Sequence, residues 1–107
     1  MTDTEHIGIE GKIIGERIGL TIDDILNKLT QEVGEFNDAI QKYRGRFCKQ
    51  KSENLDHIKE ELGDVYFNLI CIASIIGLNP NDFPKYAEET LQKFKEREDL
   101  YKRNLSA

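Results

Sequence analysis

The sequence predicts an all-α protein, folded as a compact bundle of about four helices. Apolar residues recur at the three- and four-residue spacing of amphipathic helices over most of the chain. The connections between these periodic segments are short, as in helical bundles. The composition, with 38% hydrophobic and 33% charged residues, two prolines and no tryptophan, favours this class over a disordered chain or a β-sandwich.

Length and charge narrow the class of protein further. The 107 residues suffice for one modest core, so we expect a single domain over residues 1–107. With 15 basic and 20 acidic residues, the net charge of −5 argues against nonspecific binding to nucleic acid or anionic membranes. The longest strongly apolar run, from Leu69 to Ile76, is under half of the roughly 20 residues that a membrane span needs, and no signal-peptide pattern opens the chain. A cytoplasmic protein is expected.

The two cysteines suggest neither a disulfide nor a zinc site. Cys48 lies in a polar, basic stretch. Cys71 lies in the apolar run Leu-Ile-Cys-Ile-Ala, where a free cysteine behaves as a small hydrophobic residue. We expect Cys71 to be buried in the core.

The first 20 residues have the least regular pattern in the chain. They hold half of the glycines, and each glycine inside a helix costs about 1 kcal/mol relative to alanine. Only a short helix is expected here, near residues 10–18. The glycines concerned are Gly8, Gly11, Gly15 and Gly19.

The second helix is predicted over residues 22–44. Thr21, with Asp24 three residues later, resembles a capping box, in which each side chain accepts a hydrogen bond from the other residue's backbone N–H. Gly45 follows the last periodic residue and is expected to end the helix. The apolar stripe consists of Ile22, Ile25, Leu26, Leu29, Val33, Phe36, Ile40 and Tyr43.

A basic connection leads into the third helix. Residues 45–53 have no apolar period and are interpreted as a loop. Asn54 is the predicted N-cap of the helix, and Gly77 is predicted to end it. The basic residues of the loop are Arg46, Lys49 and Lys51, and the stripe of the helix is Leu55, Ile58, Leu62, Val65, Leu69, Ile72 and Ile76.

The last helix is predicted to continue to the C-terminus. Asn79 and Pro80 form a cap followed by the proline that first turns favour, although Pro84 leaves the start uncertain by about four residues. The positions that carry the helix are Phe83, Ala87, Thr90, Leu91, Phe94 and Tyr101.

The second half of the third helix predicts self-association. From Val65 onward this helix is apolar on nearly every side, and a bundle of this size has difficulty covering it within one chain. Homo-oligomerisation, as a dimer or a tetramer, would cover it.

Two acidic pairs occupy matching positions on the second and third helices. Glu32 and Glu35 stand three residues apart on one flank of the stripe, and Glu61 and Asp64 repeat the arrangement. Each pair encloses a glycine, which is costly inside a helix unless a backbone or a ligand approaches closely. If the two helices pack antiparallel, as their short connection implies, the four carboxylates converge at the edge of the core.

This convergence predicts a metal site. Like charges about 4 Å apart repel by about 4 kcal/mol per pair at an effective dielectric constant near 20, so the cluster needs cations. Carboxylate ligands, with no cysteine or histidine nearby, select a hard ion such as Mg²⁺ or Mn²⁺. For either pair taken alone, a solvated helix face is the alternative interpretation.

Three segments of the sequence resemble the motifs of a known enzyme family. They are Leu-Thr-Gln-Glu-Val-Gly-Glu-Phe at residues 29–36, Glu-Glu-Leu-Gly-Asp-Val-Tyr-Phe at residues 60–67, and Lys93-Phe94 with Arg97. Together they are similar to the MazG-type nucleoside triphosphate pyrophosphohydrolases, over about residues 21–101. The resemblance implies an all-α enzyme whose E-x-x-E and E-x-x-D helices form a Mg²⁺ site, and which releases pyrophosphate from nucleoside triphosphates.

The resemblance also implies roles for particular residues. The catalytic metal ligands would be Glu32, Glu35, Glu61 and Asp64. Phosphate contacts on the last helix would come from Lys93 and Arg97. Two lysines on the acidic flank of the second helix could balance the carboxylates or meet substrate phosphates, namely Lys28 and Lys42. For all four basic residues, a solvated surface position is the alternative.

The chain departs from the family pattern at two positions. Many relatives carry a glutamate, sometimes assigned as the general base, where this chain has Gln31, which cannot accept a proton at neutral pH. Activation of water would then fall to a bound metal ion or to one of the motif carboxylates. Many relatives also carry an asparagine where this chain has Leu91, so recognition by that residue is not expected.

The sequence and its resemblance to this family thus predict a homo-oligomeric nucleotide pyrophosphohydrolase that depends on Mg²⁺, with Mn²⁺ as an alternative ion. The resemblance implies a role in removing non-standard nucleotides or in controlling the nucleotide pool. Water would attack the α-phosphorus and release nucleoside monophosphate and pyrophosphate. Two alternatives are a phosphoribosyl-ATP pyrophosphohydrolase-like enzyme and a noncatalytic module that binds a protein through its third helix. The sequence predicts neither the base nor the sugar of the substrate.

Overall fold

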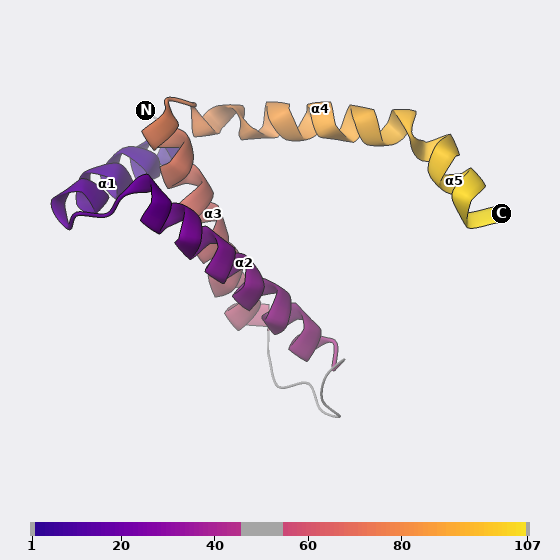
Figure 1. The fold of residues 1–107 in the computed structure, drawn as a ribbon, viewed down its shortest axis with the longest axis horizontal. Coiled ribbons are helices and arrows are strands. Elements are labelled where there is room, and N and C mark those ends of the chain that lie inside the picture. Colours follow the sequence, from indigo (N-terminus) through magenta and orange to yellow (C-terminus); the bar gives the residue numbers. More distant parts are fainter. Residues whose placement is uncertain (1, 46–54, 107) are drawn as a thin grey trace.

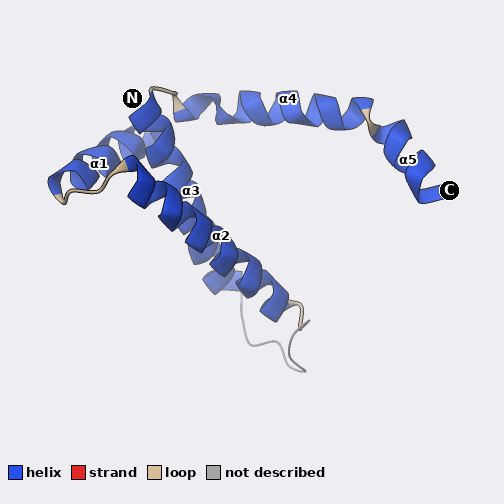
Figure 2. Ribbon diagram, in the orientation of Figure 1, coloured by secondary structure: helices blue, strands red, loops and turns tan. Residues whose placement is uncertain are grey.

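The structure, a computed structural model, describes residues 2–45 and 55–106, and within these ranges every regular element is a helix (Figure 2). The order is α1 (Asp3–Arg17), α2 (Ile22–Tyr43), α3 (Leu55–Ile76), the short 3₁₀ helix η1 (Pro80–Asp82), α4 (Phe83–Glu96) and α5 (Glu98–Ser106). The predicted all-α class is confirmed. None of the described helices is long and apolar enough to span a membrane.

Helices α1, α2 and α3 form the packed part of the molecule (Figure 1). α2 and α3 run antiparallel, as predicted, and α1 packs on α3. The core contains few side chains among the residues described, and its buried apolar ones are small or aliphatic. They are Ile25, Ala39, Ile70, Cys71 and Ala73.

The boundaries of α2 and α3 follow the local signals in the sequence. Thr21 Oγ1 accepts from the Asp24 N–H at 3.2 Å, and Asp24 Oδ2 accepts from the Thr21 N–H at 2.8 Å, so the predicted capping box is confirmed. Gly77 ends α3 with a φ of 86°, a left-handed conformation that glycine adopts without strain. The predicted Asn54 cap, the basic loop and Cys48 lie outside the described residues.

Helix α1 begins at Asp3 rather than near residue 10, so the prediction for this segment was wrong. The chain starts the helix with a second capping box, formed by Thr2 and Glu5. The glycines do not interrupt the helix because they serve its packing. A Cβ on Gly8 would collide with the Ser74 side chain, and a Cβ on Gly11 would lie 2.5 Å from Cys71 Sγ.

The predicted last helix is interrupted, and its two parts leave the bundle. α4 ends before Arg97, α5 follows, and we call the two together the C-terminal arm. Among the described elements, α4 packs against η1 and α5, and at its base Phe83 makes an edge-to-face contact with Tyr66 of α3. The radius of gyration is 17.6 Å, against about 13 Å for a compact domain of this length. The compact bundle that the sequence predicts is therefore limited to α1–α3.

Apolar side chains remain exposed on both parts. On α3, Leu62 and Ile76 are 50% and 55% exposed, and on the arm, Leu91 and Phe94 are 51% and 62% exposed. Large apolar side chains left exposed on several helices are compatible with association. Self-association therefore stays a prediction, with the arm as an additional apolar surface.

Candidate metal centre

Three of the four predicted carboxylates meet where α2 packs against α3. Glu32, Glu61 and Asp64 each offer an oxygen atom within 4.8 Å of the other two. Their environments differ, because the Glu32 and Glu61 side chains are 6% and 13% exposed, whereas Asp64 is exposed. The acidic cluster, as we call these three residues, therefore extends from the edge of the core to solvent.

Two buried oxygens of the acidic cluster lack a partner. Neither Glu32 Oε2 nor Glu61 Oε2 has a hydrogen-bond partner in the described part of the chain. Buried carboxylate oxygens are normally hydrogen-bonded or bound to a cation. Three carboxylates with two unpartnered buried oxygens therefore fit a hard divalent cation such as Mg²⁺ or Mn²⁺, which prefers oxygen ligands.

Lys28 partly compensates the charge of Glu32. Its Nζ lies 2.9 Å from Glu32 Oε1, one helical turn away on α2. The hydrogen bond from Lys28 lowers the pKa of Glu32 in spite of burial, and the same bond raises the pKa of Lys28. Glu32 is therefore a carboxylate at neutral pH, as a metal ligand must be.

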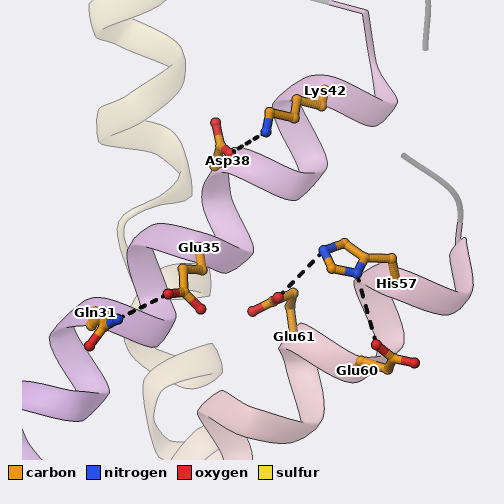
Figure 3. Close-up of polar contacts among 7 residues, drawn as sticks. All are labelled: Gln31, Glu35, Asp38, Lys42, His57, Glu60 and Glu61. Carbon is orange, nitrogen blue, oxygen red and sulfur yellow. Dashed lines mark hydrogen bonds and ion pairs between the residues drawn. The ribbon is translucent and has the colours of Figure 1, made fainter. Parts of the chain in front are cut away.

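The environment of Glu61 disfavours the charged form of its carboxyl group. Burial, followed by the charge of Glu35, raises its pKa, and His57 opposes this shift. His57 Nε2 lies 3.4 Å from Glu61 Oε1 (Figure 3). The sequence prediction placed no histidine near the acidic pairs, and this was wrong. The available signal was the four-residue spacing between His57 and Glu61, which puts both on one face of α3.

Glu35, the predicted fourth ligand, lies beside the acidic cluster rather than within it. Its Oε1 accepts a hydrogen bond from Gln31 Nε2 at 3.1 Å (Figure 3). Its charge still acts on Glu61, where it adds to the effect of burial in raising the pKa. Gln31 thus has a definite role here: it cannot act as a base, but it orients an exposed carboxylate next to the site.

The glycines enclosed by the two acidic pairs face open space. A Cβ added to Gly34 or Gly63 would meet no atom within 4 Å outside its own helix segment. Packing among the described residues therefore does not require them, and the close approach of a ligand or another chain would account for their cost.

The predicted phosphate-binding residues are dispersed. Lys28 contacts the acidic cluster, but Lys42 lies farther along α2 and pairs with Asp38 at 3.0 Å (Figure 3). Lys93 and Arg97 belong to the arm, which makes no contact with α2 and contacts none of α3 beyond its base. A single chain therefore does not bring Lys93 and Arg97 to the carboxylates.

An apolar cavity of about 430 Å³ adjoins the acidic cluster. Lys28 and Asn68 connect the two, since both line the cavity, and Asn68 Nδ2 also donates to the Asp64 backbone carbonyl at 2.8 Å. The rest of the wall includes Gly11, Ile14, Phe67 and Cys71. None of the acidic cluster itself lines this cavity. A larger cavity, of about 550 Å³, lies between α1 and the end of α3, and neither Lys28 nor Asn68 lines it.

Comparison with known proteins finds a matching family and a similar protein. Residues 20–100 match the MazG nucleotide pyrophosphohydrolase domain family. The uncharacterized protein YpjD of Bacillus subtilis (strain 168) is 31% identical over 55 residues, which are 51% of this chain and 50% of that protein, so the match spans about half the length of each. No solved structure matches. The family match covers most of the chain and both helices that carry the acidic cluster, and the protein is therefore a member of the MazG nucleotide pyrophosphohydrolase domain family.

Proposed function

We propose that the protein is a Mg²⁺-dependent nucleoside triphosphate pyrophosphohydrolase, which releases a nucleoside monophosphate and pyrophosphate. The observation that supports this most is the acidic cluster, with its two buried, unpartnered carboxylate oxygens. Membership of the family supports the reaction class. Removal or control of particular nucleotides is the role that we propose for it, and Mn²⁺ is the proposed substitute ion.

The proposed chemistry divides among the residues by their environment. Glu32, Glu61 and Asp64 would hold the cation, which neutralises the charge of the triphosphate during attack on the α-phosphorus. Glu35 is exposed, oriented by Gln31 and adjacent to the acidic cluster. We therefore propose that its carboxylate accepts a proton from the attacking water.

We assign the nucleoside to the apolar cavity beside the acidic cluster. Its volume of about 430 Å³ lies within the usual range for small-molecule sites. The Phe67 ring, 47% exposed on the cavity wall, offers a surface on which a base can stack. Lys28 stands between the cavity and the carboxylates, where it can also reach a phosphate.

We further propose that Lys93 and Arg97 act on the acidic cluster of a second copy of the chain. The arm carries both residues away from the cluster of its own chain, and its apolar side chains are exposed. A homodimer or homotetramer would bury that surface and supply cations to the outer phosphates. Lys42 remains a candidate for the same task, from α2.

A screen of common and damaged nucleoside triphosphates for pyrophosphate release tests this function. Release should require Mg²⁺ or Mn²⁺ and should be lost in Glu61→Gln, but not in Glu10→Gln, a matched change on the exposed face of α1. Selective hydrolysis of phosphoribosyl-ATP would favour the related enzyme class. Absence of both divalent-ion binding and turnover would favour a noncatalytic module that binds a protein through its exposed apolar helices.

A further inference from the structure

Each buried carboxylate of the acidic cluster has a basic residue four positions earlier on its own helix. On α2, Lys28 Nζ lies 2.9 Å from Glu32 Oε1, and on α3, His57 Nε2 lies 3.4 Å from Glu61 Oε1. In both glutamates the other oxygen, Oε2, is buried and has no hydrogen-bond partner among the residues described. The two helices thus repeat one arrangement: a base holds one oxygen, and the second oxygen is available to a cation.

We propose that His57 is a positioning residue of the metal centre, which keeps the Glu61 carboxylate inside the acidic cluster by holding its Oε1 atom. The inference rests on the proposed metal site and adds to it a residue from outside both acidic motifs. Glu61 needs such a partner, because oxygens of Glu32 and Asp64 lie within 4.8 Å of its own and repel it. Without His57, a flexible glutamate side chain can relieve this repulsion by turning toward solvent.

The other ring nitrogen of His57 also faces a carboxylate. Its Nδ1 lies 3.9 Å from Glu60 Oε2, so the imidazole stands between two carboxylates of α3 (Figure 3). Residues that contact a metal ligand in this way fix its orientation, and their loss typically weakens metal binding about 10- to 100-fold. Direct ligation by Nε2 would require the ring to release Glu61, because that nitrogen faces Oε1.

Titration of the protein with Mn²⁺, with free Mn²⁺ followed by electron paramagnetic resonance, tests the proposal in three variants. His57→Ala should raise the dissociation constant for Mn²⁺ about 10- to 100-fold. His57→Gln should restore part of the affinity, because its amide can donate to Glu61 from the same helical position. His6→Ala removes the other histidine, which is exposed on α1, and should change nothing.

Two further readouts separate positioning from other roles. Without metal, in EDTA, the melting temperature of His57→Ala should be close to that of the wild type. If His57 had a purely structural role, the substitution would lower the melting temperature in EDTA as much as it does with Mn²⁺. Spin-echo modulation should detect no nitrogen of His57 bound to Mn²⁺, and such a nitrogen would make His57 a ligand and overturn the proposal. Unchanged Mn²⁺ affinity in His57→Ala would overturn the positioning role alone, whereas a wild-type protein that binds no Mn²⁺ would overturn the proposed metal centre as well.

Discussion

The α1–α3 bundle and the C-terminal arm consist of similar amphipathic helices, but only the bundle has a core. Ile70 on α3 is 1% exposed, whereas α4 has no buried residue and its Phe94 is 62% exposed. α2 and α4 carry equally clear apolar stripes in the sequence. The difference shows that periodicity specifies a helix and its apolar face, but not the surface that will cover this face.

The two regions also divide the charges that the proposed reaction needs. The bundle contains the acidic cluster with the basic partners Lys28 and His57. The arm contains Lys93 and Arg97, out of reach of that cluster in one chain. We therefore expect the bundle to bind the cation by itself and the arm to act only in an assembly.

Substitution of a proposed metal ligand in the bundle should reduce activity more than any other change. Glu61→Gln should lower turnover roughly hundredfold or more, because it removes a ligand of the proposed cation. The fold should persist, because the change also removes one of the charges that repel one another. Steady-state kinetics measure the turnover of this variant, and thermal melts measure its stability, with Glu10→Gln as the control. Losses of activity and of stability in proportion would instead mark Glu61 as a structural residue.

The next prediction tests whether Lys93 of the arm acts at the acidic cluster of a second copy of the chain. Lys93→Ala should lower kcat/KM at least tenfold, about the contribution of one charged hydrogen bond, and Lys95→Ala, on another side of α4, should not. Equal mixing of the two impaired proteins, Glu61→Gln and Lys93→Ala, followed by exchange of subunits, should restore about a quarter of the wild-type sites in a dimer. No recovery on mixing, or a 12.4 kDa monomer by light scattering, would contradict this arrangement.

A smaller effect is expected in the apolar cavity. Phe67→Ala should raise KM for the nucleotide about tenfold, because base stacking on an aromatic ring contributes about 1–3 kcal/mol. Mn²⁺ binding should not change. Leu69→Ala, two residues later and on another side of α3, removes an exposed apolar side chain as the control. Equal KM changes in both variants would place the base elsewhere.

The smallest effect concerns stability and pH. The pKa of Glu61 is raised above its ordinary 4.5 in the folded protein, so in EDTA this group's stabilising contribution is present below pH 4.5 and is lost as pH rises through the raised value. The stability advantage of Glu61→Gln should therefore grow between about pH 4.5 and 7. Mg²⁺ at about 100 times its dissociation constant should stabilise the wild type by about 2.7 kcal/mol. A pH-independent difference in melting temperature would contradict the assignment.

Local signals account for the parts of the fold that the sequence predicts. Thr21 and Gly77 mark the ends of α2 and α3 through their own backbone geometry, so their effect does not depend on distant contacts. The start of α1 was missed although Thr2 and Glu5 provide a local capping signal, because Gly8 and Gly11 are costly locally and favourable only where they pack on α3. The departure of the arm at Phe83 has no local signal at all.

The candidate site also has parts that the sequence predicts and parts that it does not. Matching spacing on two antiparallel helices sufficed to predict that Glu32, Glu61 and Asp64 converge. The position of Glu35 was not predictable, because it depends on a hydrogen bond from Gln31 that the family pattern does not contain. His57 was missed because spacing alone does not distinguish a residue that contacts a ligand from a solvated neighbour.

Hydrolysis in ¹⁸O-labelled water identifies the phosphorus atom that water attacks. With Mg²⁺ and a nucleoside triphosphate that the protein accepts, we predict equal amounts of monophosphate and pyrophosphate from the first turnover, with the label only in the monophosphate. ³¹P magnetic resonance measures both the products and the position of the label. Nucleoside diphosphate and orthophosphate as first products, or label in the pyrophosphate, would contradict attack on the α-phosphorus at the acidic cluster.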